Sequence, residues 1–95
     1  NGRPGELKPC AWVRDPSTGR VMEVWTTEPG VQLYTANHMN GSLLGKGDKA
    51  YVKHAAFCLE TQHYPDSPNK PEFPSTVLEP GKKFVSQTIH KFSTK

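Results

Sequence analysis

The sequence predicts an all-β fold, and three features of its 95 residues support this prediction. Eight Gly and nine Pro are spread along the chain, so they divide it into short segments. Several of these segments alternate apolar with polar residues, which is the period of a half-buried strand. No long stretch places apolar residues at helical spacing. Short antiparallel strands are therefore expected throughout.

The first two expected strands form a β-hairpin. Residues 9–14 contain the run Cys-Ala-Trp-Val, and residues 20–28 are rich in Val, Trp and Thr, which favour strands. The sequence DPSTG at 15–19 is a turn, because Asp caps it, Pro presets φ and Gly accepts a left-handed φ. After Pro29-Gly30, a shorter strand is expected over 31–35.

The second half of the chain is expected to alternate loops with strands. Residues 37–49 are rich in Gly and Asn and predict a loop, whereas 55–62 and 82–92 predict strands. Residues 63–80 are rich in proline and predict an ordered, irregular crossing that packs on the rest of the fold. Its expected apolar anchors are Tyr64, Phe73, Val77 and Leu78.

Composition sets limits on the class of protein. Leu, Ile, Val and Phe number 18 of 95 residues, so the chain is poor in apolar residues, but its net charge of +3 is too small to keep it unfolded. We expect part of one domain. The longest apolar run, 55–59, is too short to span a membrane. The basic residues form no stripe for nucleic acid. Cys10 and Cys58 are expected to be free, buried thiols in a reducing compartment, which predicts a cytoplasmic protein.

Two polar residues within apolar strands are candidate site residues. Alternation places Glu60 on one strand face with Cys58 and Gln62. A buried Glu60 would be a general base with a pKa raised by burial; the alternative is a solvated or salt-bridged side chain. Gln32 is either a satisfied amide or a hydrogen-bonding group for a ligand with many hydroxyls.

A metal site has little support in the sequence. His54, Cys58 and His63 could be imagined around zinc, but they lack the paired spacing and the fourth ligand that zinc sites show. No phosphate-binding glycine loop, nucleophile elbow or catalytic triad is present in the sequence. We therefore expect no metal and no cofactor.

Three strings, read together, resemble the aldose 1-epimerase (galactose mutarotase) family. They are GRVMEVWTTEPGVQLYTAN, HAAFCLETQHYPDSPNKPEFPSTVLEPG and a closing strand that ends HKFSTK. The resemblance extends from about Pro9 to the end of the chain. It implies a large antiparallel β-sandwich of the galactose mutarotase type, to which residues 1–95 contribute only the C-terminal strands of a single domain.

The resemblance also implies a function. The family interconverts the α and β anomers of free aldoses such as galactose and glucose without a cofactor, through acid–base opening of the sugar ring. Its base is the Glu of LETQ, which is Glu60 here, and the Gln of PGVQ, which contacts sugar hydroxyls, is Gln32. The family's acid histidine and other sugar-binding residues have no matching motif in this sequence, so residues 1–95 alone are expected to be inactive. We expect the complete protein to be a monomer.

Two alternatives stay open. One is a non-catalytic carbohydrate-binding β-sandwich. The other, less favoured, is an epimerase of hexose 6-phosphates, which would need a basic cluster for the phosphate. The sequence also departs from the family's pattern at Glu28, where relatives often carry Gln or Asp, and no function is assigned to that position.

Overall fold

The computed structural model describes residues 3–95, and in that range the regular structure is strand apart from two short 3₁₀ helices. In chain order the elements are β1 (Lys8–Arg14), β2 (Arg20–Thr26), β3 (Gly30–Tyr34), β4 (Asn40–Leu44), η1 (Lys46–Asp48), β5 (Ala50–Val52), β6 (Cys58–Gln62), η2 (Ser67–Asn69) and β7 (Thr88–Thr94). All four strand pairings are antiparallel, which confirms the all-β expectation.

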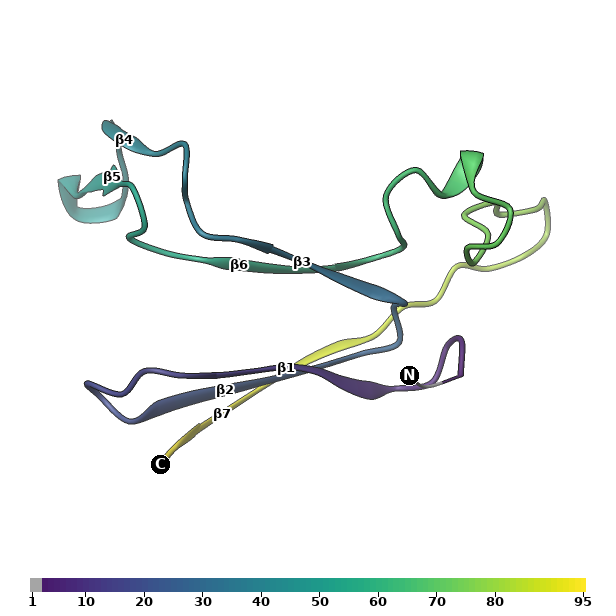
Figure 1. Ribbon diagram of the computed structural model, residues 1–95, viewed down its shortest axis with the longest axis horizontal. Coiled ribbons are helices and arrows are strands. Elements are labelled where there is room, and N and C mark those ends of the chain that lie inside the picture. Colours follow the sequence, from purple (N-terminus) through teal and green to yellow (C-terminus); the bar gives the residue numbers. More distant parts are fainter. Residues whose placement is uncertain (1–2) are drawn as a thin grey trace.

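The largest unit is a three-stranded sheet in the order β1-β2-β7, with β2 in the centre (Figure 1). Its hairpin β1–β2 confirms the predicted turn. Gly19 takes a φ of +71° and donates its N–H to the Asp15 carbonyl at 2.8 Å. The Thr18 and Ser17 hydroxyls and the Ser17 N–H donate to the Asp15 carboxylate, and they lower its pKa to about 2.

The buried core is small. Among residues 3–95 the buried apolar side chains are Val21, Val24 and Ala36, and Val24 is fully buried. In contrast, 16 large apolar side chains in that range are exposed. The radius of gyration is 16.9 Å, against roughly 12 Å for a compact domain of this length. The chain has few apolar residues, and its structure is correspondingly open, with a small core.

A two-stranded ribbon of β3 and β6 lies over the three-stranded sheet and crosses it near one end (Figure 1). The two layers are joined there by hydroxyl groups. Thr61 Oγ1 of β6 lies 2.7 Å from Thr88 Oγ1 of β7, which in turn lies 3.3 Å from Thr26 Oγ1 of β2. These contacts fix one end of the ribbon to the sheet.

The prediction of a loop over 37–49 is wrong, because this segment contains β4, which pairs with β5 in a second small ribbon. Gly41 has a φ of +86°, where a side chain would be strained, and this accounts for the glycine. Pairing with β5 is a contact outside the segment, so the glycine-rich composition of 37–49 did not reveal it.

Two strand boundaries also differ from prediction. The expected strand 55–62 begins only at Cys58, because Ala55 closes a turn onto the Val52 carbonyl and His54 has a φ of +61°. The expected strand 82–92 is instead β7, Thr88–Thr94. Residues 82–86 have no partner strand among residues 3–95, so alternation alone extended the prediction too far.

The proline-rich crossing is ordered around one of its expected anchor pairs. Tyr64 and Phe73 meet edge to face with ring centroids 5.1 Å apart. Val77 and Leu78 are exposed, so the prediction that they anchor the crossing is wrong within the part of the chain described. Cys10 and Cys58 are free, as expected, but Cys10 is only half-buried and Cys58 is exposed. Neither 3₁₀ helix within residues 3–95 has the length and apolar character needed to cross a membrane.

Candidate functional site

The ribbon β3–β6 brings the two predicted site residues together. Gln32 and Glu60 are direct partners in its antiparallel ladder. Directly opposed residues project from the same face of a sheet, so their side chains are neighbours. The adjacent rungs on this face pair Gly30 with Gln62 and Tyr34 with Cys58.

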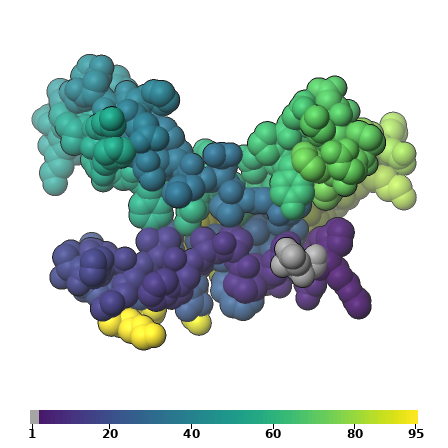
Figure 2. Space-filling view, viewed as in Figure 1, coloured from purple at the N-terminus to yellow at the C-terminus, as the bar shows by residue number. Residues whose placement is uncertain are grey.

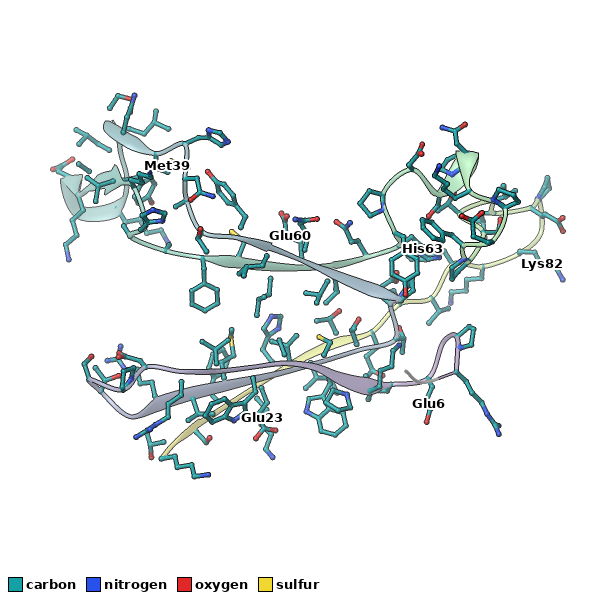
Figure 3. All side chains as sticks on the ribbon, in the orientation of Figure 1. Glu6, Glu23, Met39, Glu60, His63 and Lys82 are labelled. Atoms are coloured by element: carbon teal, nitrogen blue, oxygen red, sulfur yellow. The ribbon has the colours of Figure 1, made fainter. Side chains whose placement is uncertain are left out.

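This face is turned away from the three-stranded sheet. Figure 3 shows the Glu60 side chain pointing outward from β6, on the side opposite the sheet. Leu33 and Leu59, one position along each strand, occupy the inner face by alternation. In the space-filling view the surface is hollowed above the ribbon, between the β4–β5 end and the proline-rich segment (Figure 2). Figure 3 places Glu60 on this side of the ribbon, and Gln32 is its partner in the ladder.

Both side chains are exposed. The sequence left two interpretations of Glu60 open, a buried general base and a solvated or salt-bridged side chain, and among the residues described Glu60 is exposed. The solvated alternative describes its surroundings, and within residues 3–95 Glu60 has no ion-pair partner. The Gln32 amide nitrogen donates only to the Leu33 carbonyl, at 3.5 Å, so the amide is free to meet a ligand.

An apolar pocket of about 310 Å³ borders the site on the β4–β5 side. Tyr34 and Cys58 form the neighbouring rung on the face that carries Gln32 and Glu60. They are part of the pocket wall, together with Met39 and Tyr51. The Tyr34 ring is held in place because the His38 N–H donates to its hydroxyl at 3.3 Å and the His38 ring stacks on it. The site therefore has a polar centre and an apolar flank.

At the opposite end of the ribbon lies a contact that the sequence did not reveal. His63 Nδ1, just after β6, is 2.9 Å from Glu28 Oε2, just after β2. Glu28 is 6% exposed, and apart from this close approach of His63 no group within residues 3–95 forms a hydrogen bond to the buried oxygen. The two residues are far apart in sequence with no motif spacing, so only the fold could bring them together.

The three residues considered for zinc are each placed differently. His54 Nδ1 contacts the Thr35 carbonyl at 2.9 Å, His63 contacts Glu28, and Cys58 lines the apolar pocket. Within residues 3–95 no group of three or more His, Cys, Asp or Glu side chains is arranged to hold a metal ion.

Glu60 and Gln32 together can carry out simple chemistry. A carboxylate accepts a proton or a hydrogen bond from a hydroxyl group, and a neighbouring carboxamide both donates and accepts hydrogen bonds. Fold and site together define an all-β protein that presents a carboxylate and a carboxamide side by side on an exposed ribbon.

Comparison with known proteins specifies the family. Residues 2–91 match the family described as aldose 1-epimerase. The chain is 51% identical over 88 residues to galactose mutarotase of Mus musculus, covering 93% of this chain and 26% of that protein. It is 51% identical over 84 residues to galactose mutarotase of Homo sapiens, covering 88% and 25%. It is also 36% identical over 73 residues to aldose 1-epimerase of Escherichia coli (strain K12), covering 75% and 21%.

The chain belongs to the aldose 1-epimerase family. It spans about a quarter of the length of the galactose mutarotases that it matches, 26% in the Mus musculus protein. The resemblance found in the sequence is thereby confirmed.

Proposed function

We propose that the complete protein is an aldose 1-epimerase that interconverts the α and β anomers of free hexoses such as galactose and glucose. The observation that supports this best is the direct pairing of Glu60 with Gln32 on the exposed face of the β3–β6 ribbon. Family membership supplies the reaction, and the ribbon supplies a carboxylate and a carboxamide that one sugar ring could contact together.

In this proposal Glu60 is the general base and Gln32 binds sugar hydroxyls. The Glu60 carboxylate takes the proton of the C1 hydroxyl while the ring C1–O5 bond breaks. Rotation about C1–C2 and reclosure on the other face of the aldehyde give the second anomer. The ring oxygen needs a proton from a separate acid within hydrogen-bond reach. We assign no acid among residues 3–95.

Polarimetry of the complete protein tests the base. Freshly dissolved α-D-galactose would be followed with the wild type and with Glu60→Gln, which keeps the side-chain shape and removes the base. We expect kcat to fall by roughly 10²–10⁴-fold, the range for a general base. Glu23→Gln is the matched control, since Glu23 lies on a strand of the three-stranded sheet, outside the β3–β6 ribbon, and should leave kcat unchanged. Equal rates for wild type and Glu60→Gln would refute the assignment of the base.

A polypeptide limited to residues 1–95 is expected to be inactive, because one carboxylate without its acid cannot open the ring at an enzymatic rate. An enzymatic rate from that polypeptide would contradict this expectation. We further propose that residues 1–95 are part of a single β-sandwich domain. The complete protein would act as a cytoplasmic monomer in carbohydrate metabolism, with sugars as its only partners.

One observation favours a second candidate function. Glu60 is exposed and forms no ion pair in the part of the chain described. A carboxylate in such surroundings suits hydrogen bonding to sugar hydroxyls as well as proton transfer. A non-catalytic carbohydrate-binding protein would bind galactose in calorimetry yet leave the polarimetric drift at its uncatalysed rate.

A further inference from the structure

The contact between Glu28 and His63 closes the ribbon that carries the candidate site. Glu28 lies between the end of β2 and Gly30, the first residue of β3. His63 directly follows Gln62, the last residue of β6. Gly30 and Gln62 form the terminal rung of the ladder, so the 2.9 Å contact lies just beyond that rung. Figure 3 shows His63 at this end of β6, next to the crossing of the two layers.

Glu28 is itself held firmly. Its backbone N–H donates to Thr26 Oγ1 at 3.0 Å, and its carbonyl accepts from Lys8 Nζ at 3.0 Å. Its carboxylate is buried, and among residues 3–95 the basic group that approaches its Oε2 is the His63 ring, at 2.9 Å. A buried carboxylate without a partner is strongly unfavourable, so Glu28 has a fixed place and holds His63 to it.

Glu60 and Gln32 have no comparable support of their own. Among residues 3–95 no other element forms a hydrogen bond or ion pair with either side chain, so within this range the ladder register sets their positions. The ladder has only five rungs and its outer face is exposed. On its inner face, β6 is attached to the sheet through the hydroxyl contact of Thr61 with Thr88. The Glu28–His63 contact is the second attachment, three residues after Glu60.

We propose that Glu28 and His63 are positioning residues, which hold the end of β6 against the β2–β3 connection and so keep Glu60 opposite Gln32 for the reaction. The proposal rests on the proposed function. Neither residue touches the sugar. Their contribution is the alignment of the base with the C1 hydroxyl, because proton transfer requires the two oxygens to lie within hydrogen-bond reach.

The test is a double-mutant cycle in the complete protein with Glu28→Ala, His63→Ala and the double variant. Mutarotation of galactose would be measured as kcat per folded molecule and as KM, well below the melting temperature. We expect each single variant to lose about tenfold in kcat, inside the roughly hundredfold that a 1 Å misplacement can cost. KM should change by less than about twofold, and the double variant should lose no more than either single one.

Lys91→Ala is the matched control. It breaks a different contact between a basic side chain and a glutamate, Lys91 with Glu23 at 3.7 Å, on the three-stranded sheet. It should leave both kcat and KM as in the wild type. A role confined to stability would lower the melting temperature of the Glu28 and His63 variants without changing kcat per folded molecule, and that outcome would overturn the proposal.

A second measurement covers variants that fail to fold. Glu28→Gln keeps the size of the side chain and weakens the contact. We expect it to speed amide hydrogen exchange in β6 while leaving β1 and β2 as protected as in the wild type. Unchanged exchange in β6 would refute the proposal.

Glu60→Gln in the same polarimetric assay distinguishes failure of the proposed function from failure of the positioning role. If that variant keeps full activity, the proposed function fails. If it is inactive while the Glu28 and His63 variants keep full kcat, only the positioning role fails.

Discussion

The three-stranded sheet and the β3–β6 ribbon differ in how well they are packed and in which of them carries the candidate site residues. In the sheet, β2 forms six rungs with β1 and seven with β7, and its Val24 and Thr26 are fully buried. The ribbon has five rungs, and none of its ten residues is buried. Yet the ribbon carries both candidate site residues. The best-packed part of the structure is thus the support, and the least-packed part is the candidate site.

This difference indicates how an exposed pair of strands can hold a functional geometry. Packing fixes the register of β2 from both sides, whereas the ribbon depends on contacts at one end. Candidate site residues on a ribbon of this kind are open to a ligand, and their alignment depends on a few polar contacts rather than on a core.

The largest effect on stability is expected where the sheet is packed. Val24→Ala in the complete protein should lower the free energy of unfolding by roughly 2 kcal/mol, because two buried methyl groups are lost and a cavity remains. Leu33→Ala on the ribbon is the comparison, since Leu33 is 59% exposed, and should cost about 0.5 kcal/mol or less if it stays exposed. Chemical denaturation measures both. Equal losses would mean that the ribbon is as tightly packed as the sheet.

A smaller effect, confined to the ribbon, is expected from Gln32. Gln32→Ala removes a side chain that is exposed and makes one long hydrogen bond, so unfolding should change little. If Gln32 binds sugar hydroxyls, KM for galactose should rise about tenfold, which corresponds to about 1.4 kcal/mol. Steady-state polarimetry gives the value. An unchanged KM would show that Gln32 does not contact the sugar.

The smallest effect concerns the turn of the sheet's hairpin. The pKa of Asp15 is lowered to about 2 from 3.8 by donors from Thr18 and Ser17. Its ionised form therefore stabilises the fold above pH 4, and this contribution is lost as the pH falls toward 2. Carbon-13 NMR of the Asp15 carboxyl should give a midpoint near 2. The Asp15→Asn variant should lose less stability than the wild type between pH 4 and 2. A midpoint near 3.8 would contradict the turn geometry.

Local patterns predicted the fold well where a recognisable turn motif joins two alternating runs. The β1–β2 hairpin followed from DPSTG and its flanking runs, because turn chemistry and alternation act within a few residues. The β4–β5 ribbon and the start of β7 were missed or misplaced, because they depend on which strands meet. Alternation shows that a segment is extended, but not whether it has a partner.

The candidate site was likewise predicted only in part. Glu60 and Gln32 were selected as polar residues within apolar strands, and the structure places them directly opposite each other. The sequence left open whether Glu60 is buried, because burial depends on what covers a strand and not on the residues of the strand itself; Glu60 is exposed. The Glu28–His63 contact could not be foreseen, since two isolated residues 35 positions apart have no pattern in common.

The central claim is that Glu60 and Gln32 contact one sugar from the same face of the ribbon. A crystal structure of the complete protein carrying Glu60→Gln, with galactose bound, would test it most directly. We predict that the residue 60 side chain lies within hydrogen-bond distance of the C1 hydroxyl oxygen. The Gln32 amide should contact another hydroxyl of the same ring. Galactose bound elsewhere, or bound with position 60 out of reach of C1, would contradict the claim.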